Sequence, residues 1–523
     1  MIRAYDVETV RAAEQAAMAE LPEGELMDRA SRGLAEIAAA RLADHDGATV
    51  VGLVGAGANG GDTLYAVAHL ADAGYPAAVV LLPANGRDGV HPAGLAAAEE
   101  AGTVVRVAAD DPAAAARAVA EADVVLDGIV GIGGRPGLRP DAARLVDAVD
   151  DDAWVLAVDV ASGLDPDGGW REASGVGQPG GDATGDEPTD DDAVWADETV
   201  TFGAPKPVHL LPPGEAASGR LTVVDIGLPL DDVDAAVERL THDDVARLWP
   251  VPGQSDDKYS RGVLGVVAGG EAYTGAAVLC TTAAAEAGVG MLRYVGTPTP
   301  TALVRQAVPE AVIGEGRVQA WVVGPGLDAS SGDADADAGA QLAVARAALA
   351  GDLPVVVDAG GLDLVTGRRD APTLLTPHAG ELARLLTRLE ASGTELSGTE
   401  VTADAVKAHP LRHARRLAAL TGATVLLKGA TTLVVTEGEP VRSQADAPPW
   451  LATAGAGDVL SGIVGTLLAS GLSPHDAGSL GALVHGVTAD RVSGGGPLRA
   501  LAVAQGVRTT VRDLIRRGRS SPE

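Results

Sequence analysis

The feature that most constrains the fold is a repeated alternation of short apolar runs with alanine-rich stretches of helical length. Buried runs separated by helices are typical of a mostly parallel sheet covered by helices. Two series of such runs can be traced, at 49–54, 77–82, 124–126, 154–158 and 199–202, and then at 263–267, 292–295, 321–323, 355–357, 373–375, 424–427 and 432–435. The sequence therefore predicts an α/β protein with two sheets.

A chain of 523 residues is too long for one core, since domains hold roughly 100–200 residues. The boundary is expected near Pro229–Thr241, which gives domains at 1–229 and 241–516. A helical segment at 5–44 precedes the first series, and the tail from Arg516 is expected to be loose. The segment 175–192 is rich in Gly and Asp, which predicts an acidic, disordered insertion.

Composition excludes several classes of partner. The net charge is −33, which argues against nucleic acid, and the acidic, Phe-poor composition resembles that of a halophile. No apolar run reaches the roughly 18 residues that a membrane span needs. The first 20 residues hold no signal-peptide core, so we expect a cytoplasmic protein without a membrane partner. Cys280, the single cysteine, is expected to be a small core residue.

Lysine is scarce in this chain, and its positions are informative. The four lysines are Lys206, Lys258, Lys407 and Lys428, whereas all other cationic side chains are Arg. Such a chain is expected to keep lysine where a compact ammonium is needed. Three of the four fall within the motifs described below, and Lys407 is expected on a surface helix.

A glycine turn, Gly455-Ala456-Gly457-Asp458, runs directly into a stretch with apolar residues at helical spacing. The N–H groups at such a helix start suit an anion, and glycine lets the backbone approach it closely. Asp458 is better placed to take a proton from a hydroxyl that attacks phosphate than to bind phosphate. The alternative is an ordinary helix start with an acidic first turn.

A second glycine-rich turn, Gly55–Asp62, follows the first apolar run and matches the Gly-x-Gly-x-x-Gly dinucleotide fingerprint. A dehydrogenase would need an acid at the end of the next strand to hold the ribose. That strand ends Leu82-Pro83-Ala84-Asn85, without an acid, which disfavours an ordinary dehydrogenase.

Polar side chains also follow the strands of the first series. Asn59, Asp127, Asp159 and Ser162 are expected to converge, because parallel strands end at one edge of the sheet. Their oxygens could coordinate a hard monovalent or divalent cation. The alternative for each residue is a loop side chain that stabilises a turn.

Four motifs of the first series, Asn59–Asp62, Asp127–Gly131, Val158–Asp165 and Thr201–Pro207, resemble the NAD(P)H-hydrate epimerase domain over residues 5–229. The family usually has Asn at Ala58, Gly at Thr63 and Ile-Pro at Val160-Ala161. The resemblance implies acid/base chemistry at Asp159, with Lys206 as a helper. It implies K⁺ at Asn59, Asp127 and Ser162. The hydrate contacts that it implies are Ala58, Asn59, Gly60, Gly61, Asp62, Gly131, Ile132, Gly133, Gly134, Arg135, Pro136, Gly137 and Asp159.

The second series resembles the ribokinase-like fold, and the order of its motifs is closest to the ADP- or ATP-dependent NAD(P)H-hydrate dehydratase over 241–516. Before Gly455–Asp458 the motifs are Lys258–Gly262, Gly269–Ala276, Gly324–Gly326, Thr376–Glu381 and Leu427–Thr432. The resemblance implies ADP or ATP, bound with Mg²⁺, at Lys428, Gly429, Ala430, Thr431, Thr432 and Gly457. It implies hydrate contacts at Ala276, Gly326, His378 and Asp458, with Asp458 as the catalytic base.

The two resemblances together imply a bifunctional enzyme that repairs hydrated NADH and NADPH and is expected to form a homo-oligomer. The main alternative is a ribokinase-like hydroxyl kinase, which would have no reason to carry the first domain. A further alternative makes the first domain a nucleotide-sensing or interaction module. The sequence leaves open whether ADP or ATP is the phosphoryl donor.

Overall fold

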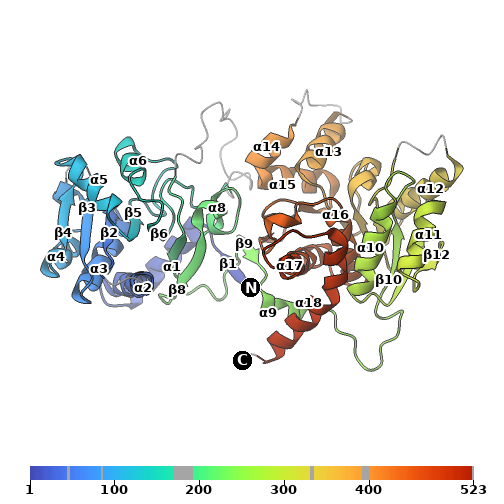
Figure 1. Cartoon of the computed structure of the whole chain (residues 1–523), viewed down its shortest axis with the longest axis horizontal. Helices are drawn as coiled ribbons and strands as arrows, with labels where there is room; N and C mark the ends of the chain where they lie inside the picture. Colours follow the sequence, from blue (N-terminus) through green and yellow to red (C-terminus); the bar gives the residue numbers. More distant parts are fainter. Residues whose placement is uncertain (44–46, 84–85, 170–192, 330–334, 392–400, 521–523) are drawn as a thin grey trace. The chain divides into compact units, whose positions relative to one another are not determined.

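The computed structural model describes residues 1–43, 47–83, 86–169, 193–329, 335–391 and 401–520. The chain forms two compact units, Arg3–Val237 and Glu238–Glu523, and Met1–Ile2 belongs to the second (Figure 1). The insertion predicted at 175–192 lies outside the described residues.

The first unit is built on a seven-stranded sheet in the order β4-β3-β2-β5-β6-β7-β8, and every strand pair in it is parallel. Its strands are β2 (Val50–Val54), β3 (Ala77–Leu81), β4 (Val104–Val107), β5 (Val124–Gly128), β6 (Trp154–Val158), β7 (Glu198–Phe202) and β8 (Arg220–Val224). The order reverses between β2 and β5, and ligands bind at such a switch point in open α/β sheets. The predicted parallel sheet is confirmed, but the edge strands β4 and β8 were not predicted, because partly exposed edge strands carry polar residues and form no continuous apolar run.

Helices cover both faces of this sheet. One core lies under α2 (Glu25–Leu42), α3 (Ala58–Asp72) and α4 (Pro92–Glu100), and another lies under α5 (Pro112–Ala120) and α6 (Pro140–Val146) (Figure 1). The helical segment predicted at 5–44 is two helices, α1 (Val7–Glu20) and α2. Gly24, at φ 83°, separates them, and this left-handed backbone suits glycine.

The second unit is built on an eleven-stranded sheet in the order β1-β9-β18-β17-β16-β15-β14-β13-β10-β11-β12. The strands from β16 to β12 pair in parallel, whereas β17 pairs antiparallel with β16 and β18. The strands are β1 (Ile2–Ala4), β9 (Val237–Arg239), β10 (Val263–Val267), β11 (Met291–Val295), β12 (Val312–Ile313), β13 (Ala320–Val323), β14 (Val355–Val357), β15 (Thr373–Leu375), β16 (Thr424–Leu427), β17 (Thr432–Val435) and β18 (Val441–Gln444). The α/β class with mostly parallel sheets is therefore confirmed.

The largest core of this unit lies beneath α9 (His242–Leu248), α10 (Thr274–Glu286), α16 (Ala456–Ala469), α17 (Pro474–Ser493) and α18 (Ala500–Ser520). The other face carries α12 (Ala336–Ala350), α13 (Ala379–Ala391), α14 (Ala403–Ala408) and α15 (Pro410–Thr421) (Figure 1). Cys280 is buried in the core, as predicted. The expectation of a loose tail from Arg516 is wrong as far as Ser520, since α18 continues to that residue.

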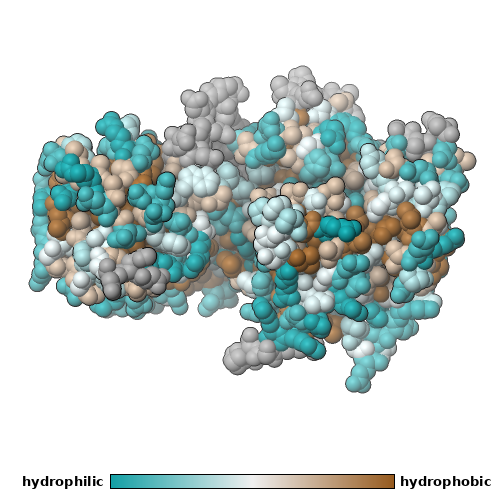
Figure 2. Space-filling view, in the orientation of Figure 1, coloured by the Kyte–Doolittle hydropathy of each residue, from teal (hydrophilic) through white to brown (hydrophobic). Residues whose placement is uncertain are grey.

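Hydrophilic and apolar residues are distributed unevenly over the surface. Hydrophilic residues cover much of the visible surface of each unit, while an apolar band crosses the second unit in the region of α10 and α16 (Figure 2). None of the helices described here is both long enough and apolar enough to cross a membrane.

Candidate active sites

Asp159 is held in an unusual backbone conformation at the end of β6. Its φ of 66° lies in the left-handed region, which is uncommon for residues other than glycine. The backbone is fixed by hydrogen bonds from Asp159 N to Val200 O at 2.7 Å and from Val160 N to Val158 O at 2.8 Å. Such backbone outliers cluster at functional sites, where the surrounding structure holds them in place.

Lys206 reaches Asp159 from beyond β7. Its ammonium donates to Asp159 Oδ1 and, at 2.9 Å, to Thr201 Oγ1, although the Lys206 side chain is only 1% exposed. Thr201 Oγ1 and Phe202 N also donate to Asp159 Oδ1, at 3.0 and 3.3 Å. All of these donors meet one carboxylate oxygen, which leaves Oδ2 as the oxygen that can face a ligand.

The imidazole of His209 is neutral and lies close to this ion pair. Burial, followed by the positive charge of Lys206, lowers the pKa of His209 to about 3. Its Nδ1 accepts a hydrogen bond from the backbone N–H of Lys206 at 3.1 Å. His209 therefore supports the backbone of Lys206 without adding a charge to the site.

Asp127 and Ser162 come together at the ends of β5 and β6, as predicted. Ser162 donates through Oγ to Asp127 Oδ1 at 2.6 Å and through its backbone N–H to Asp127 Oδ2 at 2.7 Å. Burial raises the pKa of Asp127 to about 6. Asn59 also lies here, but its amide nitrogen donates to Val158 O at 2.5 Å. Its Oδ1 lies beside Gly131, where an added Cβ would come within 3.0 Å of it.

The two glycine loops of this unit pack backbone against backbone. A Cβ at Gly55 would lie 1.8 Å from Ile129 O, and one at Gly60 would lie 2.2 Å from Gly55 O. Thr63 is accommodated because its neighbour Gly128 lacks a side chain. A Cβ there would lie 1.9 Å from Thr63 Oγ1.

The loop at 131–137 is tied to its surroundings at both ends. Arg11 on α1 donates to Ile132 O at 3.1 Å, and Gly137 N donates to Gly163 O at 2.8 Å. Both glycine-rich segments that were predicted to contact the hydrate therefore lie at the edge where Asp127 and Ser162 meet.

Two further carboxyl groups, Asp62 on α3 and Glu14 on α1, share the electrostatic environment of Asp159. Burial and then the charge of Asp159 raise the pKa of Asp62 well above its usual range. Burial also raises the pKa of Glu14, against the opposing effect of Lys206. Sequence reasoning missed Glu14. Its spacing of three residues from Arg11 on one helix face was the available signal, and it is weak.

The second unit gathers its charged residues around Asp358, directly after β14. Asp358 is 1% exposed, and its Oδ1 lies 2.8 Å from the ammonium of Lys428, at the end of β16. Thr376 donates to the same oxygen at 2.9 Å, and Ser461 of α16 donates to Oδ2 at 2.9 Å. Asp358 was not predicted. The rule that selected polar residues after strands in the first series would have found it.

The glycine turn before α16 forms as predicted, with Gly455 in the left-handed region at φ 90°. A Cβ at Gly457 would lie 3.3 Å from Lys428 Nζ, so the start of the helix lies close to this ammonium. Burial, and then the negative charge of Asp358, raise the pKa of Asp458 to about 7, while Lys428 opposes the shift. A carboxyl group that titrates near neutrality is suited to act as a general base.

His378 lies beside Lys428 but also has a structural task. The two residues form an isolated parallel bridge, and His378 Nδ1 accepts the N–H groups of Gly380 and Glu381 at 3.0 and 3.3 Å. It therefore stabilises the first turn of α13, while its side chain remains 55% exposed. Glu381 Oε2 lies 3.6 Å from Lys428 Nζ and adds a second negative charge.

Ala276 and Gly326 also come together, from the segments after β10 and β13. Gly326 has φ 63°, and a Cβ there would lie 2.7 Å from the Cβ of Ala276. The predicted turn at Lys428–Thr432, which includes Gly429, Ala430 and Thr431, connects β16 to β17. The predicted hydrate and nucleotide contacts of this unit thus follow β10, β13, β15 and β16 at their carboxyl ends, where open parallel sheets bind ligands.

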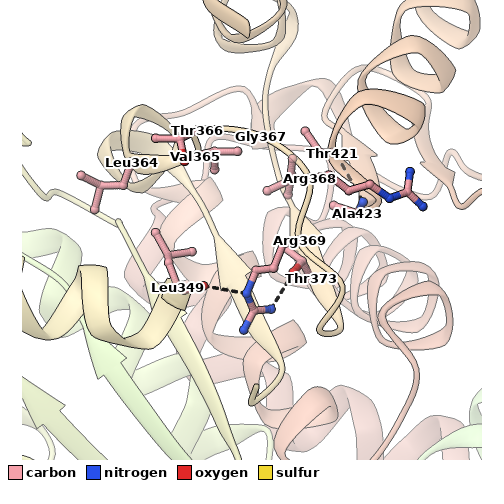
Figure 3. A pocket seen from close by; sticks show the side chains of 11 residues that line it. Leu349, Leu364, Val365, Thr366, Gly367, Arg368, Arg369, Thr373, Thr421 and Ala423 are labelled. Carbon is pink, nitrogen blue, oxygen red and sulfur yellow. Dashed lines mark hydrogen bonds between the residues drawn. The ribbon is translucent and has the colours of Figure 1, made fainter. Parts of the chain in front are cut away.

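A small cavity of about 130 Å³ lies at the opposite ends of the strands, beside the first residue of β15 (Figure 3). Arg369 is one of the residues that line this cavity, and its side chain donates to Leu349 O at 2.8 Å and to Thr373 Oγ1 at 2.7 Å. It also donates to the carbonyl oxygens of Gly351 and Leu353. Arg369 therefore satisfies the carbonyl groups at the end of α12, which indicates a structural role.

Known proteins match both units, by one family model for each unit and by relatives along most of the chain. A family model described as NAD(P)H-hydrate dehydratase matches residues 264–497, and one described as YjeF-related protein N-terminus matches residues 23–208. The bifunctional NAD(P)H-hydrate repair enzyme Nnr of Mycobacterium tuberculosis is 45% identical over 490 residues, which is 90% of each chain. The enzyme of the same name from Mycobacterium leprae is 41% identical over 98% of this chain and 99% of its own.

The ADP/ATP-dependent NAD(P)H-hydrate dehydratase from Bacillus subtilis, co-crystallised with ATP and Mg²⁺, has a TM-score of 0.45 and 23% sequence identity. The match covers 53% of this chain and 99% of that one.

Proposed function

The chain belongs to the family of bifunctional NAD(P)H-hydrate repair enzymes, and from this premise we propose that it repairs hydrated NADH and NADPH. The first unit epimerises the R- and S-hydrates. The second dehydrates the S-hydrate at the expense of ADP or ATP and releases AMP or ADP with phosphate. We assign the reactions to residues 1–229 and 241–516, a division that the two separate clusters of polar residues support.

The observation that carries the dehydratase assignment is Asp458, whose pKa is raised to about 7 at the start of α16. Hydroxide is a poor leaving group from the hydrated ring, whereas phosphate is a good one. Asp458 removes the proton from the hydroxyl as its oxygen bonds to the terminal phosphorus and the bond to the nucleotide breaks. The N–H groups at 455–458 stabilise the charge on the phosphoryl oxygens. Loss of phosphate and of a ring proton then restores the dihydropyridine.

The nucleotide is assigned to Lys428–Thr432 and Gly457. Lys428 offers the compact ammonium that a phosphate group requires, and the absence of a side chain at Gly457 lets the anion approach both the helix start and Nζ. Mg²⁺ is held mainly by substrate phosphates in many such sites, and it neutralises their charge when bound. We assign Ala276, Gly326 and His378 to the hydrate because they follow β10, β13 and β15, whose carboxyl ends lie at the same edge of the sheet.

In the first unit the proposed acid/base group is Asp159, assisted by Lys206. Epimerisation requires the hydroxyl to leave one face of the ring and return to the other, with a proton moved onto and off its oxygen. Asp159 Oδ2 can face that oxygen while Oδ1 receives the Lys206 ammonium. The hydrate is assigned to the loops at 58–62 and 131–137, which adjoin this edge of the sheet.

K⁺ is proposed between Asn59, Asp127 and Ser162. One carboxylate with neutral hydroxyl and amide oxygens suits a hard cation of low charge. Ser162 Oγ lies 2.6 Å from Asp127 Oδ1 and 3.2 Å from Val130 O, so several oxygens already converge. Within the described residues, no group of three or more His, Cys, Asp or Glu side chains is arranged to hold a metal ion.

The rival function for the second unit is a hydroxyl kinase, and product analysis separates the two. The full-length protein is incubated with NADH hydrate and ADP or ATP, and free phosphate and phosphorylated substrate are both measured. A dehydratase releases free phosphate in step with NADH, whereas a kinase accumulates the phosphorylated hydrate.

A cytoplasmic location and a homo-oligomeric state remain part of the proposal. Light scattering on the purified chain tests the oligomer.

A further inference from the structure

Asp358 connects three separate elements of the second unit. Its donors are Lys428 at the end of β16, Thr376 at the end of β15, and Ser461 on α16. Among these, Ser461 lies one helical turn beyond Asp458, so the two side chains are on the same face of α16. One buried carboxylate therefore ties the turn after β16 to the helix that begins at the glycine turn.

We propose that Asp358 is a positioning residue for the dehydration reaction: it fixes the Lys428 ammonium beneath the glycine turn and sets the charge that surrounds Asp458. The proposal rests on the role proposed above for Asp458. Asp358 lies too deep to be the base itself, because it is 1% exposed and both of its oxygens already accept hydrogen bonds.

The geometry beneath the turn supports this role. A Cβ at Gly457 would lie 3.3 Å from Lys428 Nζ and 3.7 Å from Asp358 Oδ2, so both charges lie directly under the backbone that would receive phosphate. The long, flexible side chain of Lys428 needs such a partner to hold one position, since fixing a lysine costs considerable side-chain entropy.

The opposite charges of Asp358 and Lys428 also stabilise each other. Burial would raise the pKa of Asp358, but Lys428 and the hydrogen bonds lower it below its usual range, so this carboxylate stays ionised. Burial lowers the pKa of Lys428, while Asp358 and Glu381 raise it, so the ammonium also stays charged. Burial raises the pKa of Asp458 to about 7, and the repulsion from Asp358 adds to this shift while the attraction of Lys428 opposes it.

The test is the pH profile of dehydration by full-length Asp358→Asn with S-hydrate and ATP. The substitution removes the negative charge of Asp358 and leaves Lys428 free to move toward Asp458, and both effects lower the pKa of Asp458. The acid limb, which is the part of the pH profile where kcat rises with pH, is therefore expected to shift downward by about one pH unit. KM for ATP is expected to rise several-fold. A residue with only a structural role would lower kcat at every pH and leave the limb in place, and that result would overturn the proposal.

Asp404→Asn is the matched control. It removes another Asp–Lys pair of this unit, Asp404 with Lys407 at 3.0 Å, whose side chains are 91% and 68% exposed. No change in kcat, KM or the pH limb is expected. Epimerisation by each variant, measured on the same sample, reports whether the chain has folded.

Ser461→Ala provides a second measurement in case Asp358→Asn does not fold. It keeps the buried charge pair but removes the donor to Oδ2, so KM for ATP is expected to rise while the acid limb stays fixed. An unchanged KM would overturn the proposal. The role of Asp458 fails separately, because it fails only if Asp458→Asn retains dehydration.

Discussion

Lys206 and Asp159 form an ion pair from which solvent is almost excluded, with side chains that are 1% and 9% exposed. Asp159 adopts a left-handed backbone, and Lys206 is anchored by Thr201 as well as by the carboxylate. A charged pair in this position costs desolvation energy, which makes a purely stabilising role a poor explanation for it. The arrangement therefore supports the acid/base role proposed above for Asp159.

Asp159→Asn should therefore stop epimerisation and leave dehydration of the S-hydrate intact. Asparagine keeps the shape but cannot exchange a proton, and loss of a general acid/base group typically costs ~10²–10⁴-fold. Separated epimers followed by chromatography give the rate. A parallel collapse of both activities would contradict the assignment of two separate sites.

Asp458→Asn should abolish dehydration by a similar ~10²–10⁴ factor and leave ATP affinity within a few-fold of the wild type. In the wild type, kcat should rise with pH through about 7, because Asp458 must lose its proton to act and burial raises its pKa to that value. Stopped assays across pH 5 to 9 and calorimetric ATP titrations check both statements. Activity close to the wild type in the variant would rule the base assignment out.

Gly128→Ala should destabilise the first unit, because its Cβ would lie 1.9 Å from Thr63 Oγ1. Overpacking of this kind costs roughly 1–3 kcal/mol. The double variant Gly128→Ala/Thr63→Gly should recover part of the loss, because it removes both Thr63 Oγ1 and Thr63 Cβ, which would lie 2.8 Å from the added Cβ. Urea unfolding of all four proteins measures the coupling. Gly496→Ala is the control, since its Cβ would meet nothing closer than 3.6 Å. Additive effects of the two changes would show that the contact is unimportant.

Ser162→Ala should weaken the dependence of epimerisation on K⁺. It removes one neutral oxygen from the proposed site and also the hydrogen bond to Asp127 Oδ1. Epimerisation is measured in K⁺, Na⁺ and Li⁺ at constant ionic strength, with dehydration as the internal control. Equal rates of the wild type in all three salts would exclude a specific potassium site.

Much of the fold follows from local sequence patterns. Buried strands such as β10 and β14 are fully apolar and therefore visible, and the glycine turn at Gly455 marks the start of α16 because a left-handed residue is needed there. The edge strand β8 carries the exposed Arg220 and the partly exposed Thr222, so its existence depends on pairing with β7, which a linear pattern does not reveal.

The candidate sites likewise contain some residues that the sequence pattern could identify and others that it could not. Residues that directly follow strands, such as Asp127 and Asp159, could be selected because parallel strands end together. The partnership of Asp358 with Ser461 joins residues 103 positions apart and depends on how α16 packs over the sheet. Likewise, Glu14 reaches its site only through the placement of α1, and no motif marks it.

The central claim, that one chain carries two independent sites acting in sequence, is tested most directly by complementation. Purified R-hydrate of NADH and ATP are given to Asp159→Asn, to Asp458→Asn, and to an equimolar mixture, and the absorbance of restored NADH is followed. The account predicts slow recovery with either variant alone and near wild-type recovery with the mixture, because the S-hydrate made by one protein is repaired by the other. A mixture no faster than the single variants would contradict it.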